Sequence, residues 1–460
     1  METINNNKIS KVESTDDTIT GRGGMPLFSR YMEKIGILDV MEKEFGFVRK
    51  SSKGLAVIIL FKQIFCFFIN ATSLSLKYFD ELKTDKGYAA AIETNQKDMA
   101  SSHCVKRFFK LFRWCFGNKF RKVLKKMFIW RLHVEKPETI ELYIDSMVMD
   151  NDDAHKREGV SPTYKKKKGF HPLNIIWNGK ITDTIFRGGK KHCNAGKTAA
   201  KMVCDLVRLI RKEYSKEVLI IIWCDSGFFD IKNLRAFNKI NIAFIAGGKI
   251  YADVKKTAAG TDEKDWRICK KKKNKWKFFE FGFRCLSWER FFRAFYTKCL
   301  NENKQLSLDF ARSDNIILTN IGINNKIFEH CTPQTEKRLL KPSTIIEHYH
   351  QCGTDEPAHR GFKDFGTEKL PFKKFNPNSA YFYCMVISFF LFQTIKDDIL
   401  CEVVSITAYA TTVRRRVIDI AAKIVRTGRQ IILKISRTDM KFLDFSALWE
   451  KCQNPPPIKI

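Results

Sequence analysis

The pattern of apolar positions divides the chain into a helical first part and a second part in which strands and helices alternate. From residue 25 to about 135, apolar residues recur every three or four positions, which predicts packed amphipathic helices. After Lys136-Pro137, short runs of β-branched and aromatic residues begin, and such runs are typical of strands. Their predicted order is three strands, a helix, a strand, a helix and a strand, which indicates a mixed α/β sheet with covering helices.

The elements of this α/β unit can be placed one by one. We expect strands at 140–150, 173–178, 181–187, 218–224 and 241–248, and helices at 195–214 and 231–238. Asn178-Gly179 separates the second and third strands and is a hairpin signal. The strand at 218–224 is apolar at every position, so we expect it to be buried on both faces.

The remaining segments are less regular. Between about 249 and 344, short β-like runs alternate with polar connections, which predicts a strand-rich insertion. Helix is expected again at 343–351, after Gly353 and at 379–392. Lys62 and Gln63 interrupt the apolar run at 55–69, and the run at 379–392 is shorter than the roughly 18 to 20 residues that cross a bilayer, so we interpret both as buried helices.

Net charge points to a partner. The chain has 82 Lys and Arg against 50 Asp and Glu, a formal charge of +32. Such a surface attracts polyanions, so nucleic acid is the first partner to consider, before an acidic membrane surface or a generally basic composition. Between Met99 and Val134 there is no acidic residue, and the interleaved aromatic residues are expected to form core. The residues predicted to contact DNA phosphates here are Lys106, Arg107, Lys110, Arg113 and Lys122, with a solvated face that binds nothing as the alternative.

The chain carries no recognisable targeting signal, and residues 1–24 are polar, which predicts a disordered tail. The 14 cysteines are scattered and include no Cys-x-x-Cys pair, which argues against a zinc ribbon. Both observations favour a protein of the reducing cytoplasm.

Three carboxylates lie where apolar elements would hold them. Asp145 is inside the first strand, Asp225 ends the fourth, and Glu356 is near the start of a late helix. Burying an unpaired carboxylate costs roughly several kcal/mol of desolvation free energy, and a bound divalent cation removes that cost. Mg²⁺ prefers oxygen ligands, and two such ions can promote hydrolysis of a phosphodiester. The alternatives are a backbone-bonded strand residue for Asp145 and a turn or cap residue for Asp225.

Several short motifs then occur in a familiar order. They are YIDSMV at 143–148, KGFHPL at 168–173, GGKKHCNAG at 188–196, CDSGF at 224–228 and YHQCGTDEPAHRGFKDFG at 349–366. In this order the chain resembles insertion-sequence transposases of the DDE class, in their IS-four-like group. That group has Tyr, two residues, Arg, three residues, Glu, six residues and Lys. Tyr349, Glu356 and Lys363 fall on this spacing, and Cys352 stands at the Arg position.

The resemblance implies a fold and a site. It implies a ribonuclease H-like mixed sheet with covering helices, interrupted by a β-rich insertion and preceded by an all-helical N-terminal domain. The implied catalytic and metal-binding residues are Asp145, Asp225 and Glu356, with two Mg²⁺ ions for which Mn²⁺ can substitute. The spacing to Tyr349 and Lys363 favours Glu356 over its neighbours Asp355, Glu347 and Asp364. Tyr349 and Lys363 would contact phosphate or terminal bases near the cleavage site, and His192 would touch DNA or form a turn.

The predicted function is that of a DNA transposase acting in the bacterial cytoplasm at the nucleoid. It would bind the inverted-repeat ends of its own element, cleave with Mg²⁺ and join the 3′-hydroxyl ends to target DNA, as a homodimer. No membrane or small-molecule substrate is expected. Because Cys352 replaces an arginine, a catalytically weakened, transposase-derived DNA-binding protein or repressor is the alternative. A stand-alone structure-specific nuclease is a third reading.

This interpretation predicts a division of the chain. The expected parts are a tail (1–24), a helical DNA-binding domain (25–137), a first part of the ribonuclease H-like core (138–248), a β-rich insertion (249–344), a second part of the core (345–400) and a basic C-terminal region (401–460).

Overall fold

The computed structural model describes residues 9, 11–49, 53–153, 156–192, 194–196, 198–271, 274–300, 314–352 and 356–458. Within these residues, the largest sheet has nine strands in the order β10-β11-β12-β13-β9-β8-β2-β6-β7. Their bounds are β2 (Thr139–Ser146), β6 (Leu173–Trp177), β7 (Lys180–Ile185), β8 (Leu219–Cys224), β9 (Ala243–Gly247), β10 (Arg267–Lys271), β11 (Asn274–Phe283), β12 (Phe292–Cys299) and β13 (Asp314–Thr319).

The strand directions confirm the predicted mixed sheet. β2, β6 and β7 are antiparallel neighbours, whereas β2, β8 and β9 run parallel. The crossovers are helices α8 (Thr198–Glu213) and α9 (Ile231–Lys239), as expected for a ribonuclease H-like core. All six residues of β8 are buried because β8 lies inside the sheet with both faces covered.

The hairpin between β6 and β7 turns at the predicted position. Asn178 and Gly179 both have positive φ, of 46° and 71°, which is the backbone of a two-residue hairpin loop. A small sheet, β3 (Met149–Asp150), β5 (Lys168–Phe170) and β4 (Ser161–Pro162), follows the end of β2.

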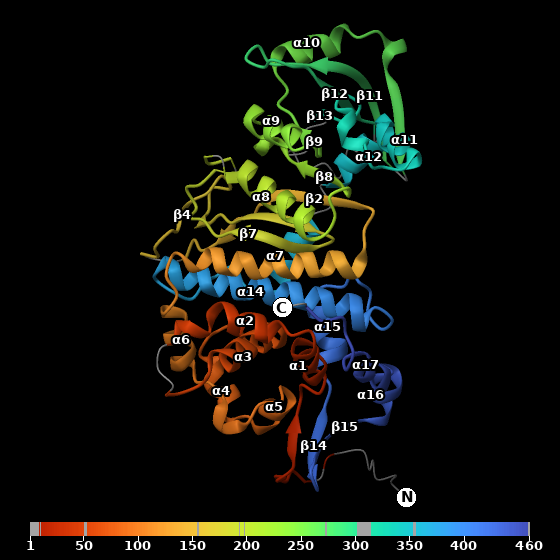
Figure 1. The fold of residues 1–460 in the computed structure, drawn as a ribbon. Helices are drawn as coiled ribbons and strands as arrows, with labels where there is room; N and C mark the ends of the chain where they lie inside the picture. The colour runs from red at the N-terminus through yellow and green to blue at the C-terminus, as the bar shows by residue number, and fades with distance from the viewer. Residues whose placement is uncertain are drawn as a thin grey trace, which may run out of the picture.

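The first part of the chain is helical, as predicted. It contains α1 (Met25–Lys34), α2 (Ile37–Phe45), α3 (Val57–Asn70), α4 (Tyr78–Thr84), α5 (Lys86–Ala91), α6 (Ser102–Lys110) and α7 (Phe116–Glu135). In Figure 1, α7 and α14 (Phe375–Ile395) lie side by side between the other N-terminal helices and the sheet. By length and composition alone α14 could cross a membrane, but 89% of its most apolar window is buried within the protein.

The expected insertion extends the core sheet and also contains helix. β13 pairs antiparallel with β9, so the strands β10–β13 continue the sheet outward. The sequence pattern predicted only strands there and missed two helices, α10 (Ala252–Gly260) and α11 (Pro333–Leu340). Three alanines in the α10 segment give it a high helix propensity that the short apolar pattern did not show.

An early strand pairs with a hairpin of the C-terminal region. β14 (Ala422–Thr427) pairs with β15 (Gln430–Ile435) and also with β1 (Thr18–Thr20). The prediction of a disordered tail over residues 1–24 is therefore wrong for Thr18–Thr20, because these three β-branched residues supply a third strand to the hairpin. The other C-terminal helices are α15 (Ala410–Val413), α16 (Arg437–Phe442) and α17 (Phe445–Lys451).

Two further helices pack against the core. They are α12 (Pro342–Cys352) and α13 (Glu356–Phe365), which follow the insertion. Ile345 and Ile346 of α12 join the apolar cluster on one face of the sheet, together with Ile221 and Ile245. This packing places the segment with Tyr349 and Glu356 against the sheet, although the segment lies more than 100 residues after the end of β9.

Candidate active site at the carboxyl edge of the sheet

Asp145 and Asp225 lie at the same edge of the sheet. β2 and β8 are parallel neighbours, and Ile144 stands opposite Cys224 in their register. The next residue on each strand is an aspartate, so the two carboxylates occur side by side where the strands end. Strand ends of this kind are where α/β sheets bind their ligands.

The Asp225 side chain caps a turn and also reaches solvent. Its Oδ1 accepts a hydrogen bond from the backbone N–H of Gly227, at 2.9 Å, and so caps the short 3₁₀ turn Ser226–Phe228. The expected turn role is thus present. The carboxyl still reaches solvent, but the surrounding protein desolvates it and raises its pKa, against the opposing effect of the Gly227 and Phe228 amides. A cation at this edge would offset that cost.

Asp145 contacts a histidine of α13. Its Oδ1 accepts a hydrogen bond from the Ser146 amide at 2.6 Å, and its Oδ2 lies 3.4 Å from Nδ1 of His359. The Nε2 of His359 lies 3.0 Å from Nδ2 of Asn174, which stands opposite Asp145 in the register of β2 and β6. Burial, together with the nearby charges of Lys363 and Lys165, lowers the pKa of His359 to about 4, so the ring is neutral near pH 7.

The backbone brings Glu356 to the same place. α13 begins at Glu356 with Pro357 in its first turn, where a proline is tolerated, as the sequence requires. His359 lies three residues on, ~4.5 Å further along the helix axis. Because His359 contacts Asp145, this geometry brings the start of α13 close to the two aspartates. The side chains of Glu356 and Cys352, and Asp355 as a whole, lie outside the described residues.

Tyr349 reaches Asp225 across a glycine. A Cβ added to Gly247, the last residue of β9, would collide with the Tyr349 hydroxyl and would come within 2.9 Å of the Ser226 amide nitrogen and 3.3 Å of the Asp225 carbonyl carbon. The absence of a side chain at 247 therefore lets the tyrosine of α12 approach the turn that holds Asp225.

Lys363 and His192 lie in different settings. Lys363 is on α13, seven residues after Glu356, and pairs with Glu368 at 2.8 Å. That carboxylate also accepts a hydrogen bond from the Asp150 amide at the end of β3. His192 is exposed in the turn after β7, and its carbonyl accepts a hydrogen bond from Arg187.

The available donors suit a hard divalent cation. Two carboxylates lie at adjacent strand ends, and carboxylate oxygens are the hard ligands that Mg²⁺ prefers. Cys224 is buried beneath the site, and burial raises the pKa of its thiol. Among the side chains that the structure describes, no three ligand-type residues cluster, and the proposed third ligand, Glu356, is not among those side chains.

A basic groove collects several of the predicted DNA contacts. It has a volume of about 1030 Å³ and lies between the α6–α7 corner and the segment that leads from α13 to α14. Lys106, Lys110 and Arg113 line one wall. The other cationic lining residues are Lys77, Lys373 and Lys374, with Glu158 as the acidic one. Arg107 is exposed on α6 outside the groove lining, and Lys122 is on α7, paired with Glu44 at 2.5 Å.

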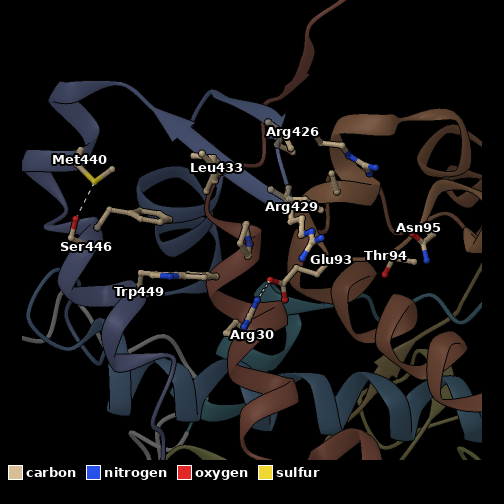
Figure 2. Close-up of a pocket in the computed structure, with 16 residues that line it drawn as sticks. Arg30, Glu93, Thr94, Asn95, Arg426, Arg429, Leu433, Met440, Ser446 and Trp449 are labelled. Carbon is tan, nitrogen blue, oxygen red and sulfur yellow. Dashed lines mark hydrogen bonds and ion pairs between the residues drawn. The ribbon is translucent and has the colours of Figure 1, made fainter.

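A different hollow, of about 710 Å³, lies between the N-terminal helices and the C-terminal hairpin (Figure 2). There the Arg30 guanidinium pairs with Glu93 and stacks over the Trp449 ring, 5.2 Å from its centroid. None of the predicted site residues lines this hollow. The contact between Arg30 and Trp449 joins the N-terminal helices to the C-terminal region.

Sequence reasoning missed several residues of the site. His359, Asn174 and Gly247 were not predicted, nor were Lys373 and Lys374 of the groove. His359 had a visible signal, because it follows Glu356 by one helical turn. Asn174 is a polar residue inside an otherwise apolar strand, which is a weaker signal. Gly247 and the two lysines required the tertiary structure.

Comparisons with known proteins identify the family. A family model described as "Transposase DDE domain group 1" matches residues 2–453. Among solved structures, a piggyBac transposase synaptic complex with hairpin DNA is similar, with a TM-score of 0.41 and 10% identity over 94% of this chain and 82% of that one. No curated protein matches. The family match spans nearly the whole chain, and the chain belongs to the DDE transposase domain family.

Proposed function

We propose that this protein is a DNA transposase that binds the inverted-repeat ends of its own element, cleaves them with Mg²⁺ and joins the 3′-hydroxyl ends to target DNA. The observation that carries the proposal is the register of β2 and β8, which sets Asp145 and Asp225 side by side, with α13 held against them through His359. Family membership supplies the reaction class.

Asp145, Asp225 and Glu356 would hold the metal. Mg²⁺, or Mn²⁺ in its place, would activate water and stabilise the leaving oxygen of the phosphodiester. The protein's own part is to fix the carboxylates: Gly227 holds Asp225, and Ser146 and His359 flank the oxygens of Asp145. Tyr349, at the Asp225 turn, and Lys363, on the face of α13 that carries His359, are the proposed contacts to DNA near the cleaved bond.

The basic groove is the proposed track for the DNA backbone. Its two walls come from the helical domain and from the segment just after α13, so a bound duplex would be fixed relative to the catalytic helix. Lysine and arginine neutralise phosphates in this way and release condensed counterions. Arg107, Lys122 and His192 are proposed as additional contacts outside the groove, and a homodimer would hold the two ends together.

Cleavage of labelled DNA tests the proposal. The substrate carries the inverted repeats that flank the gene, and wild type is compared with Asp225→Asn, in Mg²⁺ and in chelator. We expect metal-dependent cuts at the element ends by wild type, and none above background by Asp225→Asn. Asp262→Asn is the matched control, because Asp262 is an exposed acid of the insertion. Cleavage that survives Asp225→Asn would show that the site is elsewhere.

The second candidate is a DNA-binding protein that does not cleave, as a repressor would behave. Cys352 favours it, because the thiol cannot reproduce the planar, bidentate phosphate contact of the arginine usual at that position. End binding in chelator without any cut in Mg²⁺ or Mn²⁺ would establish this alternative and overturn the enzyme. Cys352→Arg would then be expected to restore cleavage.

A further inference from the structure

Three polar side chains form a row across the antiparallel strands beside the site. Asp145 stands opposite Asn174, and Asn174 stands opposite Thr184, in the registers of β2, β6 and β7. Residues directly opposite one another point to the same face of a sheet. Asn174 and Thr184 are fully buried, and the imidazole of His359 reaches this row from α13.

The hydrogen bonds in the row have one consistent direction. The Thr184 hydroxyl donates to Oδ1 of Asn174 at 2.6 Å, which turns the amide nitrogen of Asn174 toward His359. That NH₂ group can only donate, so Nε2 of His359, 3.0 Å away, accepts. In a neutral imidazole the hydrogen is then on Nδ1, the atom that lies 3.4 Å from Oδ2 of Asp145.

We propose that His359 is a positioning residue, whose Nδ1–H fixes the Asp145 carboxylate in the orientation that the metal site needs. This inference rests on the proposed function. The Asp145 side chain is 46% exposed, so contacts on both oxygens are what restrict its rotation: the Ser146 amide on Oδ1 and His359 on Oδ2. Groups that hold a metal-binding carboxylate from outside the ligand shell tune its affinity for the ion.

The same contact also fixes a distance between elements. α13 begins at Glu356, three residues before His359, so the contact of the His359 ring with Asp145 sets how near the start of the helix comes to β2. His359 would thus position the proposed third ligand as well as the first, and Asn174 and Thr184 would keep its ring in the required tautomer.

Replacing His359 with asparagine or with glutamine tests the two ring nitrogens one at a time. The amide nitrogen of His359→Asn falls near the position of Nδ1, whereas that of His359→Gln falls near Nε2. We expect His359→Gln and His359→Ala to raise the metal concentration for half-maximal cleavage by about 10- to 100-fold, the usual effect of losing such a support. His359→Asn should retain most of the wild-type metal response.

A direct measurement of metal binding accompanies the cleavage assay. Mn²⁺ titration followed by electron paramagnetic resonance should show the same order of affinities, without any DNA. Binding of end DNA in chelator should be unchanged in His359→Asn and His359→Gln, and the melting temperature should fall to a similar extent in both, because each loses the buried ring. If the residue served only to stabilise the fold, the metal response would follow the melting temperature and would not differ between the two variants.

The outcomes separate the inference from the function on which it rests. If wild type cleaves, Asp225→Asn does not, and His359→Ala responds to metal like wild type, the role of His359 is wrong. Equal losses in His359→Asn and His359→Gln would also overturn it, because the Nδ1 donor would then not matter. If wild type does not cleave, or Asp225→Asn does, the proposed function itself fails.

Discussion

Gly247 lies where three segments meet beside Asp225. It ends β9, and the space its missing side chain leaves is occupied by the Tyr349 hydroxyl and the Ser226 amide. A methyl group there has no room, because the nearest of these contacts would be far inside van der Waals distance. One hydrogen atom in place of a side chain therefore decides how closely α12 approaches the carboxylate edge.

Gly247→Ala should accordingly separate Tyr349 from the Asp225 turn. We expect it to reduce cleavage of end DNA strongly and to lower the free energy of unfolding by about 1–3 kcal/mol, the usual cost of overpacking. Rates from the labelled-DNA assay and denaturant melts would measure both effects. Gly260→Ala is the control, because a Cβ at that glycine, at the end of α10, meets nothing within 4 Å. Equal behaviour of the two variants would contradict the argument.

Helix α7 shows how one basic segment divides its charges between structure and surface. Arg121 donates two hydrogen bonds to Asp183 of β7, at 2.8 and 2.7 Å, and that carboxylate is fully buried. Lys125 approaches the same carboxylate at 3.4 Å. Lys122, one position away from Arg121, points outward and is 69% exposed. The buried pair joins the helical layer to the sheet.

Arg121→Met should therefore destabilise the protein by about 3–5 kcal/mol, since it leaves a buried carboxylate without its main partner. Lys125 will compensate in part. Lys122→Met, on the same helix, should change the free energy of unfolding by no more than about 1 kcal/mol, because its pair with Glu44 is exposed to solvent on the lysine side. Urea melts of both variants give the comparison. A smaller loss for Arg121→Met than for Lys122→Met would refute the assignment.

Across the whole molecule, the basic groove connects parts of the chain that are far apart in sequence. Lys106, Lys110 and Arg113 come from the corner between α6 and α7, and Lys373 and Lys374 come from the segment before α14. α6, which carries Lys106 and Lys110, packs against α14, whose first turn lines the other wall, and this packing brings the two walls together. The groove therefore depends on a tertiary contact that the charge pattern along the chain does not reveal.

Replacing Lys106, Lys110 and Arg113 together with glutamine should weaken DNA binding at all sequences. The slope of log K against log salt should become shallower by roughly 2 to 3, at about 0.9 per lost phosphate contact. Lys34, Lys43 and Lys83 replaced in the same way are the control, because these lysines are exposed on the same helical domain outside the groove. Titrations with a labelled duplex at several salt concentrations measure the slopes. Equal slopes for the two triple variants would show that the groove is not the track.

The sequence by itself determined the local helices and strands and the residues that are candidates for catalysis. An apolar strand that ends on an acid was visible as Leu219 to Asp225, and the spacing of Tyr349, Glu356 and Lys363 indicated the late helix. Period-two and period-3.6 patterns express which face of one element is buried, so they are readable without knowing the neighbour. The family resemblance, which the family match bears out, ordered these pieces.

Only the tertiary structure decided which elements meet. The register of β2 and β8 and the contact of His359 with Asp145 join residues 80 or more positions apart. The space beside Gly247 depends on atoms that only packing brings together. Sequence patterns record that a side chain is buried but not what it is buried against. For the same reason, Thr18–Thr20 could not be recognised as a strand, since its partner β14 lies about 400 residues away.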